Sequence, residues 1–567
     1  MNRNDPFKAY GNSQPSWLFP FVVSVVFALS ALPLGRLAYT GVVSSLNGDI
    51  WRLLADPALW DAALNTLSTS FLGMLISLGI GGAFALALTL CDIRGKSILS
   101  FLFMLPMMIP PQVTALSWIG MTGPSSTLLK AIGLAPAMGS PQPLYSIAGI
   151  ALLLGVQHAP LVYLSLRAGL LALPQDGIEA AKLSGASPRR VLCDIILPLS
   201  TPGLIAGAAI SFVSNVGNFG IPAILGIPAS IFTLPTLIYS RFASFGTSTF
   251  GDIAILSTMI AIISVAGLAL QERAMKGRDY RIIGLSGKAA TFRLGLWRVA
   301  AELALWLVLF FMLVAPLTAL VASSLAPAYG VPLSLKTATL HAYEELLYRQ
   351  SVTRTAFRNS LFLATATSLC LLAVTVLTAY FLVRGKSRFM FLLSALVDIP
   401  YALPGVVISV SFVLLFAAPI PLLGITLYGT IWIILLAYFS SFFAVSLKPM
   451  VSAFLQFDPS LEEAARLSGA GFWRRLKDII LPLVGPAAGA SVILVFLIAC
   501  NELTVSALLW SAGTQTLGVL IYNLDDSGSF DLASALSVLV VIMVIFLMLL
   551  LEILGRYLPK GVVPWRN

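Results

Sequence analysis

Long apolar runs follow one another along this chain, and short polar segments separate them. Windows of about 20 residues place six predicted spans in the first half, near 17–35, 64–90, 98–121, 146–168, 199–224 and 252–270. Six more lie in the second half, near 296–323, 358–383, 389–417, 425–447, 485–510 and 533–555. A helix needs about 20 apolar residues to cross the hydrocarbon of a bilayer. The pattern therefore predicts an all-α polytopic membrane protein with about twelve transmembrane helices.

The composition of the chain favours the same fold class. Of its 567 residues, 58% are hydrophobic and 10% are charged, and the mean hydropathy is +0.94. A soluble domain carries about a quarter charged residues. A membrane β-barrel would show short segments of alternating polarity, whereas the apolar runs here are continuous. The chain is therefore expected to be helical and embedded in a lipid bilayer.

The basic residues are distributed unevenly between the two sides of the predicted membrane. With the N-terminus in the cytoplasm, 26 of the 34 Lys and Arg residues fall on the cytoplasmic side, in 1–16, 93–98, 167–198, 272–298, 384–388, 447–484 and 555–567. Positive charge accumulates on that side of membrane proteins. We therefore predict that both termini are cytoplasmic. The net charge of +10 then reflects membrane topology, and no nucleic-acid partner is expected.

One charged segment occurs twice in the chain. Residues 179–199 recur as 463–483, with 15 of 21 positions identical at a constant offset of 284. Both copies fall on the predicted cytoplasmic side, and residues 176–199 and 460–483 are called the first and second signature loops. Loops that only cap a helical bundle have no reason to stay alike. The repetition favours a docking element for a partner with two copies or two lobes.

Shorter matches extend the repeat over the rest of the chain. The matching pairs share their sequence or their spacing: Arg94–Ser97 with Arg384–Ser387, Pro106 and Pro110 with Pro400 and Pro404, and Asn65–Leu67 with Asn359–Leu361. We predict two parallel six-helix repeats, residues 1–271 and 296–567, joined by a basic cytoplasmic linker at 272–295. Parallel repeats usually place a translocation path between the two halves. The duplication itself therefore points to transport.

Each signature loop is predicted to fold as a short helix, a glycine elbow and a second, amphipathic helix. In the first loop, Gly185 follows good helix formers, as a C-terminal cap glycine does. Ser187 and Pro188 then restart a helix in N-cap and first-turn positions. Apolar residues follow at helical spacing, at Val191, Leu192, Ile195, Ile196 and Leu199 in the first copy and at Leu476, Ile479, Ile480 and Leu483 in the second.

The signature loops resemble those of a known family. Glu-Ala-Ala, a glycine six residues after the glutamate and a later Ile-x-Leu-Pro occur in both copies. This pattern is similar to the cytoplasmic loop of permease subunits of bacterial ABC importers, and it implies a fused permease with both halves in one chain. In that family the loop is a coupling helix that docks into a groove on the ATPase. The docking residues that the resemblance implies are Glu179, Ala180, Ala181, Gly185, Glu463, Ala464, Ala465 and Gly469.

The resemblance also implies the partners of the chain. They are a cytoplasmic ABC ATPase dimer that hydrolyses ATP and a periplasmic solute-binding protein, at a bacterial inner membrane. The chain itself is then expected to be no enzyme and to bind no cofactor. Gly95–Ser97 and Gly385–Ser387 look like the end of a phosphate-binding loop, but Leu90 and Tyr380 stand where the first glycine of that loop would fall.

Polar residues inside the apolar runs are candidates for the lining of a translocation path. A charged side chain in the bilayer is costly and usually faces a cavity. Asn501 and Glu502 lie in the eleventh predicted span and Asp398 in the ninth, and Asn218 stands at the position equivalent to Glu502. The alternative for Glu502 is a place at the outer end of its helix.

The histidines and cysteines predict no metal site. The four cysteines show no paired spacing and are interpreted as small apolar residues. Only two histidines are present, so no histidine cluster exists. His158 and the adjacent Gln157 are expected to bond neighbouring helices rather than a ligand.

The cargo is the least defined part of the prediction. Residues 218–226 and 501–509 are most similar to permeases of the ferric-iron type, so ferric iron is the expected cargo. Thiamine, phosphonate or another small solute is the alternative within the family. Outside it, secondary transporters of the major-facilitator kind also have twelve spans as six plus six. Their short basic loops follow the second and eighth spans, whereas the signature loops here follow the fourth and tenth.

Overall fold

Helices make up the fold of the chain. The computed structural model describes residues 15–173, 175–243, 249–276, 292–385, 388–419, 424–456 and 458–554. The first half contains α1 (Leu18–Val26), α2 (Leu32–Leu46), α3 (Asp49–Leu54), α4 (Pro57–Leu90), α5 (Lys96–Met108), α6 (Pro111–Met121), α7 (Thr127–Ala131), α8 (Ile147–Leu171), α9 (Gln175–Leu183), α10 (Pro188–Val191), α11 (Leu197–Gly217), α12 (Gly220–Gly226), α13 (Leu234–Ala243) and α14 (Thr249–Met275). The second half contains α15 (Trp297–Leu309), α16 (Ala315–Ser324), α17 (His341–Glu344), α18 (Ser351–Arg384), α19 (Arg388–Ala402), α20 (Gly405–Phe416), α21 (Ile431–Gln456), α22 (Pro459–Leu467), α23 (Phe472–Arg475), α24 (Leu481–Cys500), α25 (Ser506–Leu509), α26 (Leu517–Asp526) and α27 (Phe530–Leu554).

The predicted fold class is confirmed. Within the described ranges, ten helices are long and apolar enough to cross a bilayer, and two bent pairs bring the number to twelve if each pair counts as one span. The same order of elements occurs in both halves, from the 34-residue helices α4 and α18 to the signature loops and beyond. The predicted linker at 272–295 lies mostly outside the described residues, and the boundaries of the two repeats stay a prediction.

Two predicted spans, 98–121 and 389–417, are sharply bent in the structure. α5 and α6 meet at 103°, and α19 and α20 meet at 109°. Each bend falls at the second proline of the repeated pair, where Pro110 and Pro404 have extended ψ angles of 139° and 145°. Proline lacks an N–H group and disfavours helix in the residue before it. The proline spacing that marks the repeat in the sequence therefore breaks both spans.

The first span of each repeat packs against the other half of the chain. Val22 of α1 is fully buried in the apolar cluster that contains Leu363 and Phe381 of α18. Leu309 and Leu320 of the α15–α16 span share one apolar cluster with Leu116 of α6. α2 also packs on α20, and α16 packs on α6. This exchange buries apolar surface between the halves, so neither half forms a complete core alone.

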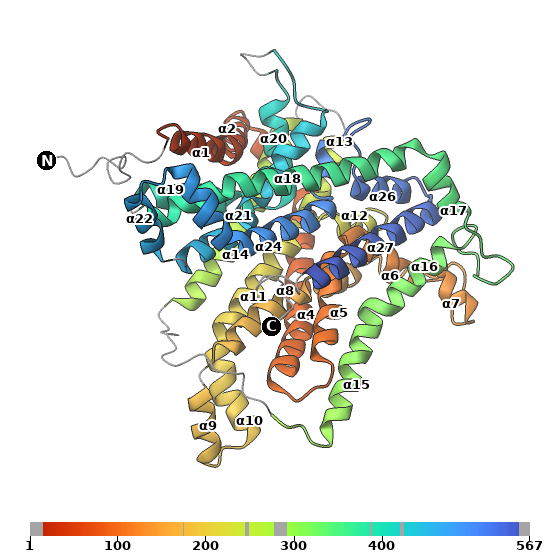
Figure 1. Ribbon diagram of the computed structural model, residues 1–567. Helices are drawn as coiled ribbons and strands as arrows, with labels where there is room; N and C mark the ends of the chain where they lie inside the picture. The colour runs from red at the N-terminus through yellow and green to blue at the C-terminus, as the bar shows by residue number, and fades with distance from the viewer. Residues whose placement is uncertain are drawn as a thin grey trace.

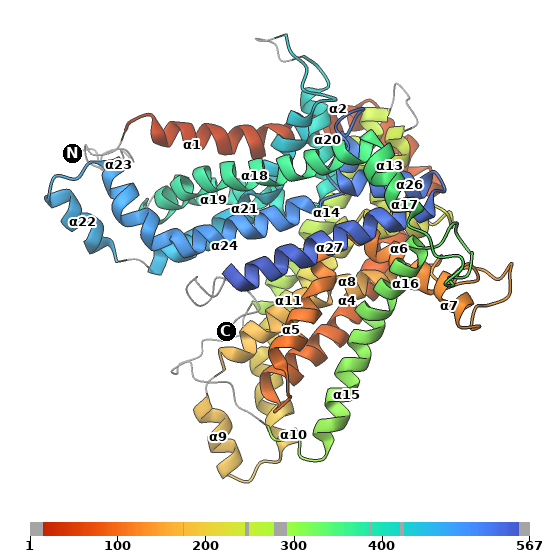
Figure 2. The same cartoon turned by 45° about the vertical axis from the view of Figure 1, so that its right-hand side comes forward.

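The two halves diverge toward the signature loops. In both views, the first-half helices α4, α8 and α11 extend to one tip, where α9 and α10 lie (Figure 1, Figure 2). The second-half helices α18, α21 and α24 extend to a different tip, which carries α22 and α23 (Figure 2). α13 and α26 lie where the halves converge. The two signature loops therefore project from separate tips of the molecule.

The repeated Asn-Thr-Leu and Asn-Ser-Leu motifs hold equivalent loops in the two halves. Asn65 Nδ2 donates to the carbonyl of Phe232 at 3.0 Å, and Asn359 Nδ2 donates to the carbonyls of Gly513 and Gln515, each at 3.0 Å. The hydroxyls that follow, of Thr66 and Ser360, accept from the first backbone amides of α13 and α26 at 2.8 and 2.9 Å. These motifs are therefore structural, and they position the helices that lie where the halves converge.

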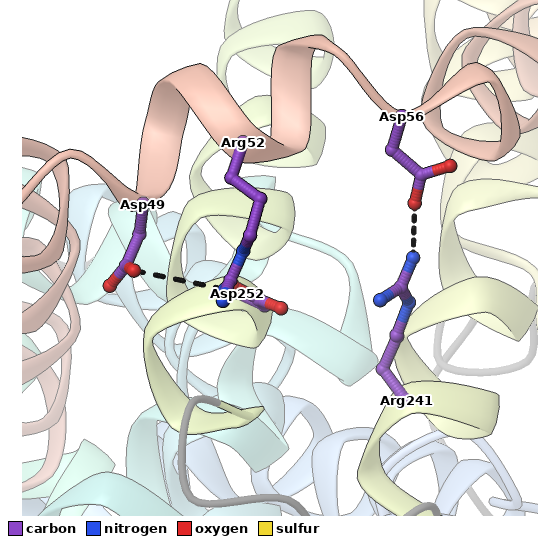
Figure 3. A network of polar contacts seen from close by, with 5 residues as sticks. All are labelled: Asp49, Arg52, Asp56, Arg241 and Asp252. Atoms are coloured by element: carbon purple, nitrogen blue, oxygen red, sulfur yellow. Dashed lines mark hydrogen bonds and ion pairs between the residues drawn. The ribbon is translucent and has the colours of Figure 1, made fainter.

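Ion pairs join α3 and the residue before α4 to two later helices of the same repeat (Figure 3). Arg52 lies 3.7 Å from Asp49 and hydrogen-bonds Asp252 of α14. Arg241 of α13 binds Asp56, the residue before α4. Both arginines belong to the minority of basic residues on the predicted outer side, and carboxylates compensate their charges locally. They therefore do not oppose the predicted topology.

The hydrogen bonds of the two asparagines predict that their alanine variants differ in stability. Replacing Asn359 by alanine removes two hydrogen bonds, and replacing Asn65 by alanine removes one. Since one such bond contributes about 0.5–1.5 kcal/mol, Asn359→Ala should lower the melting temperature of the purified protein more than Asn65→Ala. Thermal unfolding in detergent measures both. Equal losses would contradict the assigned contacts.

Candidate functional site

The signature loops fold as predicted, with a glycine elbow between two helices. Gly185 and Gly469 both have left-handed backbone, with φ of 81° and 80°. Such angles suit glycine, because other residues meet a steric penalty there. After the elbow the backbone stays helical from Pro188 to Gly217 and from Phe472 to Cys500, with a π-helical turn at Leu192–Ile196 and at Leu476–Ile480. Each elbow is thus joined to a transmembrane helix by continuous helical backbone.

Side-chain caps define the start of the helices in both loops. Ser187 Oγ accepts from the backbone amide of Arg190 at 3.4 Å, which confirms the predicted cap. In the second loop, Asp458 Oδ1 accepts from the backbone amide of Ser460 at 2.9 Å and caps α22. This hydrogen bond lowers the pKa of the Asp458 carboxyl. Both loops are therefore structured elements.

Most of the predicted docking residues are exposed at the surface. Glu179, Ala180 and Gly185 are exposed in the first loop, as are Glu463, Ala464 and Gly469 in the second. Ala181 and Ala465 are partly buried. The two copies thus present the same residues to their surroundings.

Two leucines that were not predicted as site residues stand out on these loops. Leu183 and Leu467 occupy equivalent positions at the ends of α9 and α22, and each is 90% exposed. A leucine at the same place in two otherwise polar segments is the sequence signal that could have found them. Burying one leucine side chain contributes about 1.5–3 kcal/mol. Each loop therefore offers an apolar contact to a partner.

The bend between α5 and α6 leaves backbone carbonyls to be satisfied inside the protein. Gln157 of α8 donates through Nε2 to the carbonyls of Pro106 and Ile109, at 2.7 and 2.9 Å. Its Oε1 accepts from Thr114 Oγ1 of α6 at 2.8 Å. His158 contacts Asn215 Oδ1 of α11 at 2.6 Å. The prediction that these residues bond neighbouring helices is confirmed.

Asn218 and Glu502 are equivalent caps of short helices after α11 and α24. Asn218 Oδ1 accepts from the backbone amide of Ile221 at 3.1 Å. Glu502 Oε1 accepts from the backbone amide of Val505 at 2.5 Å. Both side chains supply an oxygen to an amide that the break in the helix has left free. This accounts for polar residues at these positions inside apolar runs.

The breaks of one half contact the bend of the other half. Asn501 Nδ2 donates to the carbonyl of Met108, at the end of α5, at 2.6 Å. Gly217, the residue equivalent to Asn501, packs on Pro404, where an added Cβ would lie 2.9 Å from the proline Cβ. The ends of α11 and α24 and the bends of both halves therefore meet in one region. We call this region, with Asn218, Asn501 and Glu502, the junction.

Gln112 is a junction residue that the sequence analysis missed. Its side chain is fully buried between Gly220 of α12 and Gly518 of α26. A Cβ added at Gly518 would lie 3.1 Å from Gln112 Nε2, and one at Gly220 would lie 3.2 Å from Oε1. Among the described residues, no group hydrogen-bonds either atom. The signal was available, since a glutamine follows two prolines in an apolar run where the other repeat has Val406.

Asp398 occupies a different place from the other candidates for the path. It lies on α19 about one turn before the bend, and it pairs with Lys448 of α21 at 3.5 Å. Lys448 also lies over the Tyr401 ring, 4.5 Å from its centroid. Both members of the ion pair are about half exposed, at 60% and 49% for Lys448 and Asp398. The position opposite in the first half is the buried Met104.

The described residues hold no evident metal centre. In the ranges given above, no three His, Cys, Asp or Glu side chains lie close enough together to bind an ion. The four cysteines, all within these ranges, are free.

Comparison with known proteins identifies the family. Residues 77–276 and 372–564 each match the model of the binding-protein-dependent transport system inner membrane component. The chain is 27% identical to a probable ABC transporter permease of Sinorhizobium fredii, over 95% of this chain and 93% of that protein. It is 25% identical to the ferric transport system permease FbpB of Actinobacillus pleuropneumoniae, over 90% of this chain and 74% of that protein.

A shorter relative matches one part of the chain only. The molybdenum transport system permease ModB of Escherichia coli is 31% identical over 220 residues, which is 38% of this chain and 93% of that protein. A permease of that length corresponds to one repeat, and this chain carries two family domains in sequence. Members of the family are membrane components of transport systems rather than enzymes. The chain belongs to the binding-protein-dependent transport system inner membrane components, and it is a fused permease subunit of an ABC importer.

Proposed function

We propose that the two signature loops are the docking elements for a separate ABC ATPase dimer, one loop for each ATPase subunit. The observation that carries this proposal is the equivalent exposure of Leu183 on α9 and Leu467 on α22, two helices that lie at separate tips (Figure 2). A protein with two equivalent grooves would bury both leucines at once. The exposed glutamates Glu179 and Glu463 lie on the same short helices and add a polar contact.

The continuous helices supply a route from the docking elements to the junction. Each runs from just after a glycine elbow to a break in the junction, over 30 residues in the first half and 29 in the second. At 1.5 Å per residue the route is about 45 Å long. A displacement of a docking element therefore tilts a helix whose far end is Gly217 or Cys500. In this proposal, ATPase closure opens the contacts between the halves at the junction.

The junction is the proposed gate of the translocation path. Asn218, Asn501, Glu502 and Gln112 place polar groups there, and Asn501 bonds directly to the other half. Separation of the halves would break the bond between Asn501 and Met108 and would expose the amide of Gln112. Asp398, paired with Lys448, lies outside this set and is proposed to line the path on the cytoplasmic side of the gate.

The proposed topology places the signature loops and both termini in the cytoplasm of a bacterial cell. The uneven distribution of basic residues supports it. The periplasmic solute-binding protein then docks at the opposite end, where the halves converge near α13 and α26 (Figure 1). In this proposal the chain binds no cofactor of its own, because ATP is hydrolysed by the partner subunit.

Ferric iron is the proposed cargo, taken as substrate from the binding protein. The relationship to a ferric transport system permease over 90% of this chain supports it. Phosphonate, thiamine, molybdate or another small solute is the alternative.

Substitution of the two exposed leucines should weaken binding of the ATPase to this chain. After gentle solubilisation, the amount of ATPase bound to the double variant Leu183→Asp with Leu467→Asp should be lower than that bound to the original chain by a factor of about ten or more. The reason is that each leucine contributes about 1.5–3 kcal/mol when buried. Quantitative mass spectrometry of the co-purified subunit measures this loss. Leu335→Asp is the control, because Leu335 is fully exposed between α16 and α17, away from the loops. Normal retention in the double variant would refute docking through these tips.

Gln112 predicts a gain in stability. Because a buried amide without a partner costs about 1–3 kcal/mol, Gln112→Leu should raise the melting temperature and favour the closed gate, and so slow uptake. Gln157→Leu is the matched control: it removes three hydrogen bonds and should lower the melting temperature. The assignment fails if both variants lose stability to the same extent.

The cargo is tested by uptake in cells that lack this chain. Loss of ferric iron uptake, with molybdate uptake unchanged, is the expected result when radioactive forms of both are supplied. Complementation with the intact gene should restore iron uptake. Unchanged iron uptake together with lost molybdate uptake would refute the cargo while leaving the permease function in place.

A further inference from the structure

The second signature loop contains a buried cluster of charged residues. Glu462 of α22 lies with 8% of its side chain exposed, next to the exposed Glu463. Its carboxylate accepts from the Tyr380 hydroxyl at 2.7 Å. It also pairs with Arg384 at 3.4 Å and with Arg475 at 3.7 Å. Of two adjacent glutamates, one therefore points into the protein and the other is free for a partner.

The cluster connects three parts of the second half. Tyr380 and Arg384 lie at the end of α18, and Arg475 lies on α23, after the glycine elbow. Arg475 is 1% exposed and also donates through Nη1 to the carbonyl of Ala470 in the elbow, at 3.1 Å. Glu462 thus joins the helix before the elbow to the helix after it and to α18.

The first signature loop is held by apolar residues at the same places. At the offset of 284, Glu462 corresponds to Ile178 and Arg475 corresponds to Val191. Ile178 is 2% exposed and Val191 is fully buried, and both belong to one apolar cluster. In the alignment of Arg94 with Arg384, where the offset is 290, Tyr380 corresponds to the buried Leu90 and Arg384 to the exposed Arg94. The two repeats therefore keep the same backbone with ionic packing in one copy and apolar packing in the other.

Electrostatics explains why both positions differ together. A buried charge is tolerated when it is paired, and removing one partner leaves the other charge uncompensated. Replacing both partners by apolar residues of similar volume is often neutral. Glu462 with Arg475 and Ile178 with Val191 are each consistent pairs. A mixed pair would bury Arg475 without the Glu462 carboxylate, or Glu462 with one arginine partner fewer.

We propose that Glu462 and Arg475, with Arg384 and Tyr380, are positioning residues that fix the second signature loop to α18. The loop then moves with the transmembrane helices of its half when it is displaced. ATPase docking on this loop depends on the ion cluster, whereas docking on the first loop depends on apolar packing. The last statement rests on the docking function proposed above, and the positioning role does not.

Hydrogen–deuterium exchange of the purified chain tests the positioning role without the ATPase. Glu462→Ile removes the carboxylate that Arg384, Arg475 and Tyr380 share, and Arg475→Val removes one of its two arginine partners. The double variant places the apolar pair of the first loop at these two positions, with Arg384 beside it as Arg94 stands in the first half. Each single variant should raise amide exchange across 459–471 by about tenfold or more, with 175–187 unchanged. The double variant should return exchange to within about threefold of the original protein. The proposal would be overturned if amide exchange in the double variant were as fast as in the single variants, or if the single variants exchanged like the original protein.

Cross-linking in the native complex separates this role from docking itself. Ser184→Cys and Ser468→Cys are equivalent exposed positions next to the elbows. When Glu462→Ile or Arg475→Val is added, cross-linking of the ATPase through residue 468 should fall by about tenfold, whereas cross-linking through residue 184 should persist. The double variant should regain the cross-linking at 468. Absence of cross-links at both positions in the otherwise unaltered chain would refute docking, while the exchange experiment would still decide the positioning role. Equal loss at 184 and 468 would contradict the separate anchoring of the two loops.

Discussion

A backbone group that leaves a helix inside a bilayer must find its partner within the protein, because lipid offers none. This constraint governs the centre of the molecule, where four spans are broken. Gln157 donates hydrogen bonds to backbone carbonyls at the α5–α6 bend. Asn218 and Glu502 accept hydrogen bonds from backbone amides that lack a helical partner after α11 and α24. The polar residues inside the apolar runs thus permit the breaks, and the breaks create the junction between the halves.

The junction and the signature loops form one mechanical unit in each half. A continuous helical segment joins each glycine elbow to a break, and in the proposed mechanism its two ends move together. The exchange of the first spans binds the halves together at the same time. In the proposed mechanism the exchanged spans hold the halves together while a tilt of each half opens their contacts at the junction. Fusion of the two repeats in one chain suits that motion.

The sequence predicted the repeated parts of the structure well. The signature loops, their glycine elbows and the Ser187 cap rest on local rules that hold in any context. The bends at Pro110 and Pro404 were not predicted, because a hydropathy window averages apolar character along the sequence and carries no information on the direction of the helix axis. Gln112 was missed because its burial between Gly220 and Gly518 depends on packing between distant helices. In the same way, adjacent glutamates such as Glu462 and Glu463 look alike until the fold buries one of them.

The most direct test of the account is the distance between the two signature loops during ATP turnover. The native Cys193 and the variant Lys477→Cys are equivalent, exposed positions at the bases of the loops. Spin labels on these two, with Cys91, Cys370 and Cys500 replaced by alanine, report that distance in the complex from native membranes. The account predicts that the loops approach each other when the ATPase is trapped closed with ATP and vanadate. A distance that stays the same in the trapped and nucleotide-free complexes would contradict it.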